Sequence, residues 1–203
     1  SAIKKKLLSK YNLDCFDRKA LDLSNEESVN NFLINNKNKY DHIVFTSGIN
    51  NLVSYEKITK SLINKTLDIN IINFIIIISS LIRNKQKKNN GSITMISSLY
   101  GTYGRSNRLP YVISKHALNG ACKTLSIELG KENIRVNTIS PGFIETSLTR
   151  KNLSSKEIKN IESKIPLKKL GKAKDVANVV SFLISNQAKY ISGTDIVVDG
   201  GFS

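Results

Sequence analysis

The sequence contains few cysteines and prolines, no tryptophan, and about half as many acidic as basic residues. Its two cysteines, Cys15 and Cys122, are too few for a disulfide framework or a cysteine-rich zinc site. Stability must therefore come from a packed core. We expect both thiols to be buried and inert, no metal site, and a reducing compartment, the cytoplasm. With 203 residues, of which 40% are hydrophobic, the chain is expected to form one folded domain, residues 1–203.

Negative charge is scarce, since 31 Lys and Arg against 16 Asp and Glu give a net charge of +15. Such an excess indicates a nucleic-acid partner only where the basic residues cluster. Here lysines are spread from Lys4 to Lys189, with short runs at 4–6, 85–88 and 168–169. We therefore expect a solvated basic surface and no nucleic-acid partner, and a nucleic-acid-binding face is the rival interpretation.

Long hydrophobic runs are also lacking. The most apolar run, residues 71–78, is shorter than the roughly 20 residues that cross a bilayer, so we expect a buried helix and no membrane partner. Residues 1–12 have a helical apolar pattern but no apolar signal core and no initiating Met. We expect the chain to begin within a helix.

What the sequence does contain is an alternation of short apolar segments with longer helical ones. Six segments are predicted strands: residues 13–16, 19–23, 42–47, 92–98, 135–140 and 195–199. Helices are predicted over about 24–36, 55–84 with a break near Leu67, 110–129, 154–163 and 173–185. Continuous apolar stretches in the strands indicate burial on both faces. The predicted fold class is therefore α/β, with a doubly wound parallel sheet.

Tyr111 and Lys115 are the first candidates for chemistry. Their spacing of four residues places both side chains on one face of the predicted helix. An ammonium within about 4–6 Å of a phenol lowers its pKa toward neutrality, so that the phenol can give or take a proton at neutral pH. Such a pair also arises by chance in a lysine-rich chain, so the surrounding residues decide.

Small and hydroxyl side chains lie at three predicted strand ends. Ser98 ends one strand, Ser47 and Gly48 end another, and Pro141 and Gly142 end a third. The carboxyl edge of a parallel sheet is where α/β folds bind ligands. A hydroxyl at this edge could donate to a substrate oxygen while a nearby phenol transfers the proton.

Together these motifs resemble the classical short-chain dehydrogenase/reductase family, which are single-domain NAD(P)-dependent enzymes with a Rossmann-like fold. The matching motifs run through nearly the whole chain in the family's order: LDLSN, TSG, an Asn in the long helix, ISS, YxxxK, SPGFIET and SGTDIVVDGG. Segment 147–178 and the ending DGGFS are similar to the 3-oxoacyl-acyl-carrier-protein reductase branch. The resemblance implies an oxidoreductase that transfers hydride between a nicotinamide and a carbonyl or secondary alcohol.

The resemblance also implies four catalytic residues. Tyr111 is the acid/base, and Lys115 lowers its pKa and binds the nicotinamide ribose. Ser98 polarises the substrate carbonyl, and Asn70 holds a water that relays protons to Lys115. Ser97 is an alternative to Ser98, although the interval of thirteen residues to Tyr111 favours Ser98. Asn70 could also cap a break in its helix, and the two roles are compatible.

Further positions are implied to bind the cofactor, NAD or NADP, together with Tyr111 and Lys115. They are Asp22 and Leu23 at the adenine, Thr46, Ser47 and Gly48 along the ribose, and Pro141, Gly142, Ile144 and Thr146 at the nicotinamide. Asp17 could accept hydrogen bonds from the adenosine ribose and favour NAD. The adjacent Arg18 could instead bind the 2′-phosphate of NADP, and the sequence leaves both alternatives open.

Two features depart from the family pattern. The glycine-rich TGxxxGxG loop and its preceding strand, which hold the pyrophosphate, are missing. We therefore expect an N-terminally truncated chain that, as given, folds poorly and binds NAD(P) weakly. Thr46 replaces an asparagine of the family's Asn-Asn-Ala-Gly motif, although a hydroxyl can still form hydrogen bonds. Because the pyrophosphate loop is missing, an inert fragment is a third interpretation, beside the enzyme and the nucleic-acid-binding protein.

The resemblance implies the partners as well. Residues 147–178 are expected to form a mobile substrate lid, and the isoleucine-rich helix is expected to pack against a second subunit in a homo-oligomer, a dimer or a homotetramer. The substrate is a small carbonyl compound or alcohol, either carried on an acyl carrier protein or free. Lys87, Lys88 and Lys131 could meet an acidic carrier protein, whereas Glu132 stands where that branch often has Arg.

Overall fold

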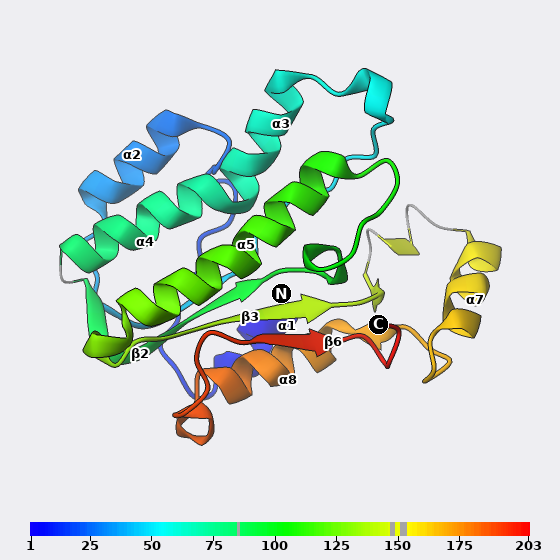
Figure 1. The fold of residues 1–203 in the computed structure, drawn as a ribbon. Helices are drawn as coiled ribbons and strands as arrows, with labels where there is room; N and C mark the ends of the chain where they lie inside the picture. The colour runs from blue at the N-terminus through cyan, green and yellow to red at the C-terminus, as the bar shows by residue number, and fades with distance from the viewer. Residues whose placement is uncertain (85, 147–148, 151–153) are drawn as a thin grey trace.

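Four parallel strands form the centre of the protein (Figure 1). A computed structural model describes residues 1–84, 86–146, 149–150 and 154–203. In its central sheet β1 (Tyr40–Phe45), β2 (Lys87–Ile96), β3 (Arg135–Pro141) and β6 (Asp195–Val198) lie side by side in that order. The pairings between them are parallel, with Ile93 of β2 opposite both Ile43 of β1 and Val136 of β3. The predicted α/β class is confirmed, and the carboxyl ends of these strands share one edge.

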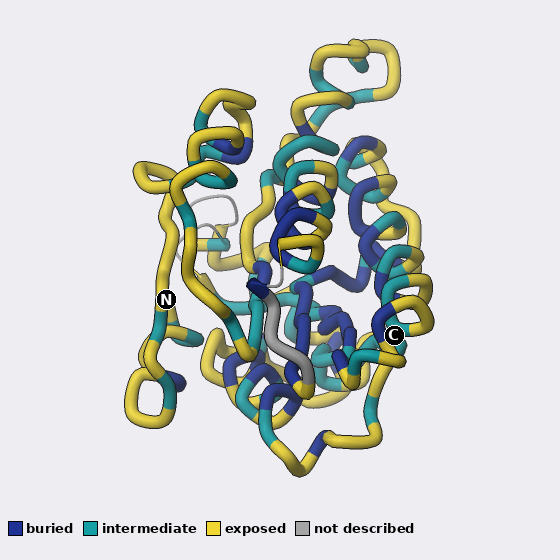
Figure 2. Tube along the Cα trace, turned by 90° about the vertical axis from the view of Figure 1, so that its left-hand side faces the viewer, coloured by how far each residue is buried: buried dark blue, intermediate teal, exposed yellow. Residues whose placement is uncertain are grey.

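Helices cover both faces of this sheet, because its strands are apolar on both sides. On one face α2 (Glu26–Asn35), α4 (Asn73–Arg83) and α5 (Leu109–Glu128) enclose a core cluster that contains Ile93 and Met95. On the other face α1 (Ala2–Leu7) and α8 (Ala173–Leu183) pack around Ile139. All three side chains are 0% exposed. Figure 2 shows that the buried positions follow the central strands and the inner sides of the helices.

Two of the predicted strands are wrong: residues 13–16 and 19–23 form loop and turn. Asp17 Oδ1 accepts hydrogen bonds from the backbone N–H groups of Lys19 and Ala20, at 2.9 and 3.1 Å, and these bonds fix a turn between the two segments. Side-chain oxygens therefore take the place of a strand ladder in this part of the chain. The other four predicted strands, residues 42–47, 92–98, 135–140 and 195–199, are confirmed as β1, β2, β3 and β6.

The two cysteines differ in their exposure. Cys15 lies exposed in the N-terminal loop, so the prediction of a buried thiol is wrong there. Cys122 on α5 is 1% exposed, as predicted. Burial raises the pKa of the Cys122 thiol to about 11, which keeps it protonated and unreactive at neutral pH.

The long helix predicted over 55–84 is interrupted where a break was expected. A 3₁₀ turn, η1 (Tyr55–Lys57), precedes α3 (Lys60–Leu67), and a π-helical turn, η2 (Asp68–Ile72), joins α3 to α4. The π-helical turn buries Asn70 and Ile71. Its wider winding therefore directs a polar side chain into the fold.

The helical stretch Lys60–Arg83 is long and apolar enough to cross a membrane by length and composition, which the sequence analysis did not expect. Its mean hydropathy is 1.6, and 44% of its most apolar window is buried within the fold. Phe74, Ile77 and Ile78 lie in the core with no more than 6% of their surface exposed, which is the pattern of a core helix. Ile72 and Ile76 are 42% and 46% exposed, so part of this helix remains uncovered.

Beyond the carboxyl end of β3, two short strands pair in parallel: β4 (Ile144–Glu145) and β5 (Gly171–Lys172). The predicted lid, residues 147–178, begins after β4, and its positions 147–148 and 151–153 lie outside the described residues. α7 (Ser155–Lys164) begins after Ser154, which forms a capping box with Glu157, and this confirms the helix predicted there. The side chains of Lys87 and Lys88 also fall outside the described part of the chain. Two more 3₁₀ turns are η4 (Gly130–Glu132) and η5 (Asn186–Ala188).

Candidate active site

The carboxyl edge of the sheet brings the four predicted catalytic residues together. Ser98 follows β2 and precedes the 3₁₀ turn η3 (Leu99–Gly101), and Asn70 lies in η2. Tyr111 and Lys115 lie in the first two turns of α5. Asn70, Ser98 and Lys115 are 0%, 8% and 4% exposed. Three separate elements therefore place polar side chains in one largely dry region.

Ser98 is the serine that reaches the tyrosine. Its hydroxyl forms a hydrogen bond with the side chain of Tyr111 and also accepts the backbone N–H of Tyr100 at 3.2 Å. The adjacent Ser97 instead donates to the carbonyl oxygen of Lys115 at 3.2 Å. The two neighbouring serines thus have different partners, and only the first has its hydroxyl beside the phenol.

Lys115 is buried beside the ring of Tyr111. Its Nζ donates to the carbonyl oxygen of Ile96 at 2.9 Å and lies 5.5 Å from the centroid of the Tyr111 ring. Burial lowers the pKa of the Lys115 ammonium from 10.5 to about 8. The predicted placement of the two side chains on one helix face is therefore found in the structure, and the Lys115 ammonium loses its proton at a lower pH than that of an ordinary lysine.

The pKa of Tyr111 is raised, whereas the sequence analysis expected Lys115 to lower it. Burial of the phenol is the largest cause, because it disfavours the charged phenolate. The hydrogen bond from Ser98 and the positive charge of Arg108 lower this pKa, and they offset only part of the burial effect. Arg108 was not singled out from the sequence, because it belongs to none of the recognised motifs.

Asn70 is tied to two other elements. Its Oδ1 accepts the N–H of Ile49 at 2.8 Å, and its Nδ2 donates to the carbonyl oxygen of the same residue at 3.0 Å. Nδ2 also donates to Ser114 Oγ at 2.9 Å, and Ser114 donates to the carbonyl oxygen of Tyr111 at 2.7 Å. Ser114 was missed by sequence reasoning, and its only signal was its position three residues after Tyr111 on the buried side of the helix.

Gly48 lies next to these groups and leaves room for about one methyl group beside them. A Cβ placed on Gly48 would lie 3.5 Å from both Lys115 Nζ and Asn70 Oδ1, which is ordinary contact distance. The fold itself therefore does not require glycine at this position. The missing side chain leaves room for a ligand beside the buried ammonium, and this fits the ribose side of a dinucleotide.

Gly142, by contrast, is required by packing. A Cβ there would lie 2.7 Å from Asp199 Cβ and 2.9 Å from its Cα. The N–H of Gly142 donates to the carbonyl oxygen of Val198 at 3.0 Å, so the chain after Pro141 stays against β6. Further along, Thr146 Oγ1 accepts the N–H of Thr149 at 3.1 Å. These predicted nicotinamide residues surround the end of β3.

The predicted adenine residues lie in the loop before α2. Asp22 accepts hydrogen bonds from the N–H and hydroxyl of Ser24 and pairs with Arg18 Nε at 3.1 Å. These contacts, those of Ser24 first, lower the pKa of Asp22 to about 2. The carbonyl oxygen of Leu23 accepts Asn73 Nδ2 at 2.9 Å, which fixes this loop to the start of α4. No described contact joins Asp17 to the catalytic residues.

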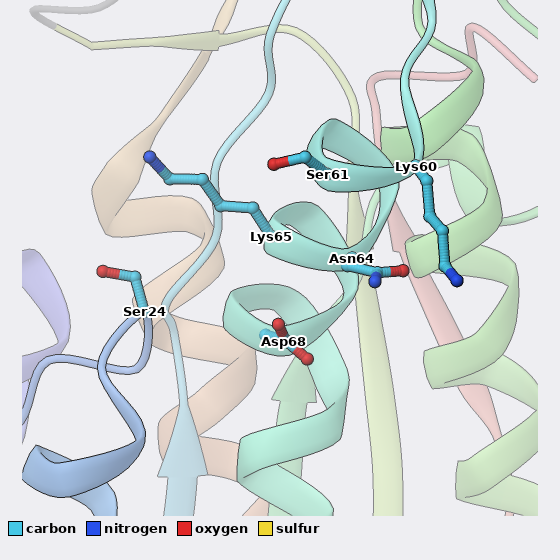
Figure 3. A pocket seen from close by; sticks show the side chains of 6 residues that line it. All are labelled: Ser24, Lys60, Ser61, Asn64, Lys65 and Asp68. Atoms are coloured by element: carbon cyan, nitrogen blue, oxygen red, sulfur yellow. The ribbon is translucent and has the colours of Figure 1, made fainter.

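A cavity of about 560 Å³ opens next to this loop (Figure 3). Its lining is polar and comes from the loop before α2, from α3 and from η2: Ser24, Lys60, Ser61, Asn64, Lys65 and Asp68. In Figure 3, Ser61 and Lys65 extend toward the side of Ser24, and Lys60 extends to the opposite side. None of the four predicted catalytic residues is among those that line it.

Comparison with known proteins adds independent information. A family model described as enoyl-(acyl carrier protein) reductase matches residues 4–203. The 3-oxoacyl-(acyl-carrier-protein) reductase of Rickettsia conorii is 37% identical over 198 residues, which cover 96% of this chain and 80% of the relative. That of Buchnera aphidicola subsp. Schizaphis graminum is 42% identical over 135 residues. This second match covers 66% of the chain and 55% of the relative, so the chain spans only about half the length of some curated relatives.

A solved structure resembles the whole chain. The 4-hydroxyisoleucine dehydrogenase complexed with NADH and succinate superposes with a TM-score of 0.86 at 29% identity. The match covers 100% of this chain and 93% of that one. The parallel sheet and its two helical layers are therefore those of a known dinucleotide-binding dehydrogenase.

Proposed function

The chain belongs to the short-chain dehydrogenase/reductase family, and we propose that it transfers hydride between a nicotinamide cofactor and a carbonyl compound or secondary alcohol. One observation carries this proposal: the buried Tyr111 hydroxyl is hydrogen-bonded to Ser98 and flanked by the Lys115 ammonium. A phenol in such a setting is suited to proton transfer at a substrate oxygen.

In the proposed reduction, Tyr111 moves the proton and Ser98 holds the oxygen. The phenol donates its proton to the carbonyl oxygen, while Ser98 Oγ donates a hydrogen bond to the same atom. When bound, the reduced nicotinamide supplies the hydride, so that carbonyl, NAD(P)H and one proton give alcohol and NAD(P)⁺. The raised pKa of Tyr111 keeps the phenol protonated at neutral pH, as an acid requires. Oxidation moves the same atoms in reverse.

Lys115 and Asn70 support the tyrosine in this proposal. The Lys115 ammonium binds the nicotinamide ribose in the space beside Gly48. Both side-chain N–H groups of Asn70 already donate, one to Ile49 and one to Ser114. A water that relays protons therefore donates its hydrogen bond to an oxygen atom of Asn70.

We propose NAD as the cofactor. In this proposal the Asp17 carboxylate accepts from the ribose hydroxyls, and Arg18 is already paired with Asp22, which leaves it less available to a 2′-phosphate. The 4-hydroxyisoleucine dehydrogenase that resembles this chain was solved with NADH, which supports the same choice. Adenine contacts fall to Asp22 and Leu23. The remaining cofactor contacts, along the ribose and nicotinamide, fall to Thr46, Ser47, Gly48, Pro141, Gly142, Ile144 and Thr146. No residues are assigned to the pyrophosphate, since the sequence contains no TGxxxGxG motif.

The substrate, assembly and location follow as further parts of the proposal. The names of the relatives support a 3-oxoacyl group on an acyl carrier protein as one candidate substrate. Lys131 in η4, just after α5, is the proposed docking residue for such an acidic partner. The exposed Ile72 and Ile76 support a homo-oligomer, a dimer or tetramer. Bacterial relatives of this kind and the scarcity of cysteine support a cytoplasmic location.

The experiment that tests the proposal is cofactor-dependent turnover. The full-length protein is titrated with NADH and NADPH, followed by cofactor fluorescence, and then assayed with a panel of aliphatic ketones and 3-oxoacyl thioesters. Loss of reduced cofactor in step with alcohol formation is the expected result. No cofactor binding together with salt-sensitive binding of duplex DNA would instead favour the nucleic-acid interpretation.

A further inference from the structure

Two arginines lie in the segment of chain that leads to Tyr111. Only six of the 31 basic residues are arginines, and two of these six, Arg105 and Arg108, lie in the loop between Ser98 and Tyr111. An arginine presents a planar guanidinium that can bind both oxygens of a carboxylate, which a lysine cannot do. An arginine in this otherwise lysine-rich chain is therefore a candidate for binding a carboxylate through both of its oxygens.

Arg108 interacts with the loop that follows β1 and with the Tyr111 phenol. Its Nη1 donates to Asn50 Oδ1 at 2.5 Å. Its charge is also one of the influences that lower the pKa of Tyr111, so the guanidinium lies within electrostatic range of the reacting hydroxyl. Arg105 lies nearby, with its Cζ 5.9 Å from the ring centroid of Tyr100.

Neither guanidinium has an anionic partner within the described residues. The ion pairs found there join Arg18 to Asp22 and Arg150 to Glu145. A guanidinium within electrostatic range of the Tyr111 hydroxyl, with a second one in the same loop and no described carboxylate of the protein paired with either, can attract an anion from outside. The charge at this position thus favours a negatively charged substrate.

An apolar cavity adjoins Arg105 and residues on both sides of Arg108 in the sequence, Asn107 and Leu109. It has a volume of about 350 Å³ and lies between the loop after β1 and the start of α5. The N–H of Val53 donates to the carbonyl oxygen of Asn107 at 3.0 Å, which joins the two walls. Side chains of Val53, Ile58, Leu109 and Val112 supply apolar surface, and Arg105 lies in the lining. This volume is at the lower end of the range for small-molecule sites.

From these observations we propose that the substrate is a small aliphatic carbonyl compound, or the matching alcohol, that carries its own carboxylate. Arg108, assisted by Arg105, binds the carboxylate, and the aliphatic part lies in the cavity between Val53 and Val112. This inference rests on the proposed function, because it places the carbonyl at Tyr111 and Ser98. A 3-oxoacyl thioester carries no charge beside its carbonyl, so it would leave both guanidiniums without a partner.

The test compares short aliphatic oxo acids with their methyl esters as substrates for NADH-dependent reduction. The variants are Arg108→Gln, which keeps a donor for Asn50, and Arg83→Gln, which makes the same change at the last turn of α4, at the other edge of the sheet. Wild type and R83Q are expected to prefer the acid roughly 10-fold or more in kcat/KM, since a charge-assisted hydrogen bond is lost in the ester. In R108Q this ratio falls to about one while ester turnover continues.

Other outcomes separate the inference from the proposed function. The carboxylate assignment is overturned, and the oxidoreductase proposal left intact, by any of three results. These are equal turnover of acid and ester, a preference for the acid that R108Q retains, or faster reduction of an oxo compound that carries a phosphate monoester or a thioester in place of the carboxylate. Calorimetric titration with hexanoate and hexanamide needs no turnover. Hexanoate binding that R108Q loses and R83Q keeps supports the carboxylate site even if reduction fails, whereas no turnover and no hexanoate binding overturns both proposals.

Discussion

The side-chain amide of Asn70 donates to the hydroxyl of Ser114 at 2.9 Å, and both side chains are 0% exposed. The same hydroxyl donates to the carbonyl oxygen of Tyr111 at 2.7 Å. A continuous chain of hydrogen bonds therefore connects the π-helical turn η2 to the first turn of α5. We infer that Ser114 is a positioning residue, which holds the tyrosine's helix turn in place and does not itself contact the substrate.

Replacement Ser114→Ala removes this connection. One N–H of the Asn70 amide then lacks a buried acceptor, and an unsatisfied buried donor costs about 1–3 kcal/mol. We expect the free energy of unfolding, measured by urea denaturation, to fall by that amount, and kcat to fall while KM for the cofactor changes little.

Ser126→Ala is the matched control for this change. Ser126 lies on the same helix and makes the same type of bond, donating to the carbonyl oxygen of Lys123 at 2.7 Å, but among the residues that the structure describes it bonds to no second side chain. We expect its stability to stay within about 0.5 kcal/mol of wild type. Equal losses in the two variants would show that the connection through Ser114 has no special role.

The lowered pKa of Lys115 predicts how the free energy of unfolding depends on pH. Below about pH 8 the ammonium is charged in both states, and the native state bears the full cost of burying it. Between about pH 8 and 10.5 the unfolded state binds more protons, so stability rises with pH. The shift corresponds to ~3 kcal/mol.

The measurement compares wild type with Lys115→Met by urea unfolding across this pH range. We expect the stability of wild type relative to K115M to increase by ~3 kcal/mol as the pH rises from below 8 to above 10.5. Lys123→Met, at an exposed site on the same helix, is expected to follow wild type. If the difference in unfolding free energy between wild type and K115M does not change with pH, burial does not disfavour the charged form of Lys115.

Gly48 tests the space left for the cofactor. In Gly48→Ala the new methyl meets Lys115 Nζ and Asn70 Oδ1 at 3.5 Å, without a clash, so the fold should change in stability by only about 0.5 kcal/mol. The methyl group nevertheless occupies the space assigned to the ribose. We expect the Kd for NADH, measured by fluorescence titration, to rise about tenfold or more.

Gly120→Ala provides the comparison, because a Cβ at this helical position meets no described atom within 4 Å apart from the nearby backbone of its own helix. It should stabilise the protein by about 1 kcal/mol through helix propensity and leave NADH binding unchanged. Unaltered affinity in G48A would place the ribose elsewhere.

The alternation of apolar segments was enough to predict the parallel sheet and most helices, because burial on both faces leaves a strong pattern. It failed for residues 13–16 and 19–23, which have similar composition. There the hydrogen bonds go to the side chain of Asp17, and local capping of this kind is not visible in hydrophobic periodicity. The expected break near Leu67 was correct, although only the structure reveals its π-helical form.

The candidate site was likewise only partly predictable from the sequence. Motif spacing identified Ser98, Tyr111 and Lys115, which the fold brings together. The direction of the Tyr111 pKa could not be predicted, because it depends on how deeply the phenol is buried and not on the nearness of a lysine. Ser114 and Arg108 also escaped notice, since a serine in a helix and an arginine in a loop acquire meaning only from their partners in space.

Replacement of Tyr111 by phenylalanine is the most direct test of the proposed chemistry. Tyr111→Phe removes one oxygen atom and should keep the fold, by circular dichroism, and the Kd for NADH. Tyr103→Phe makes the same change at a tyrosine that is 49% exposed in the neighbouring loop, and it should keep full activity. We predict that kcat for NADH-dependent carbonyl reduction falls by about 10²–10⁴-fold in Y111F alone. Reduction by Y111F at the wild-type rate would contradict the assignment of Tyr111 as the proton donor.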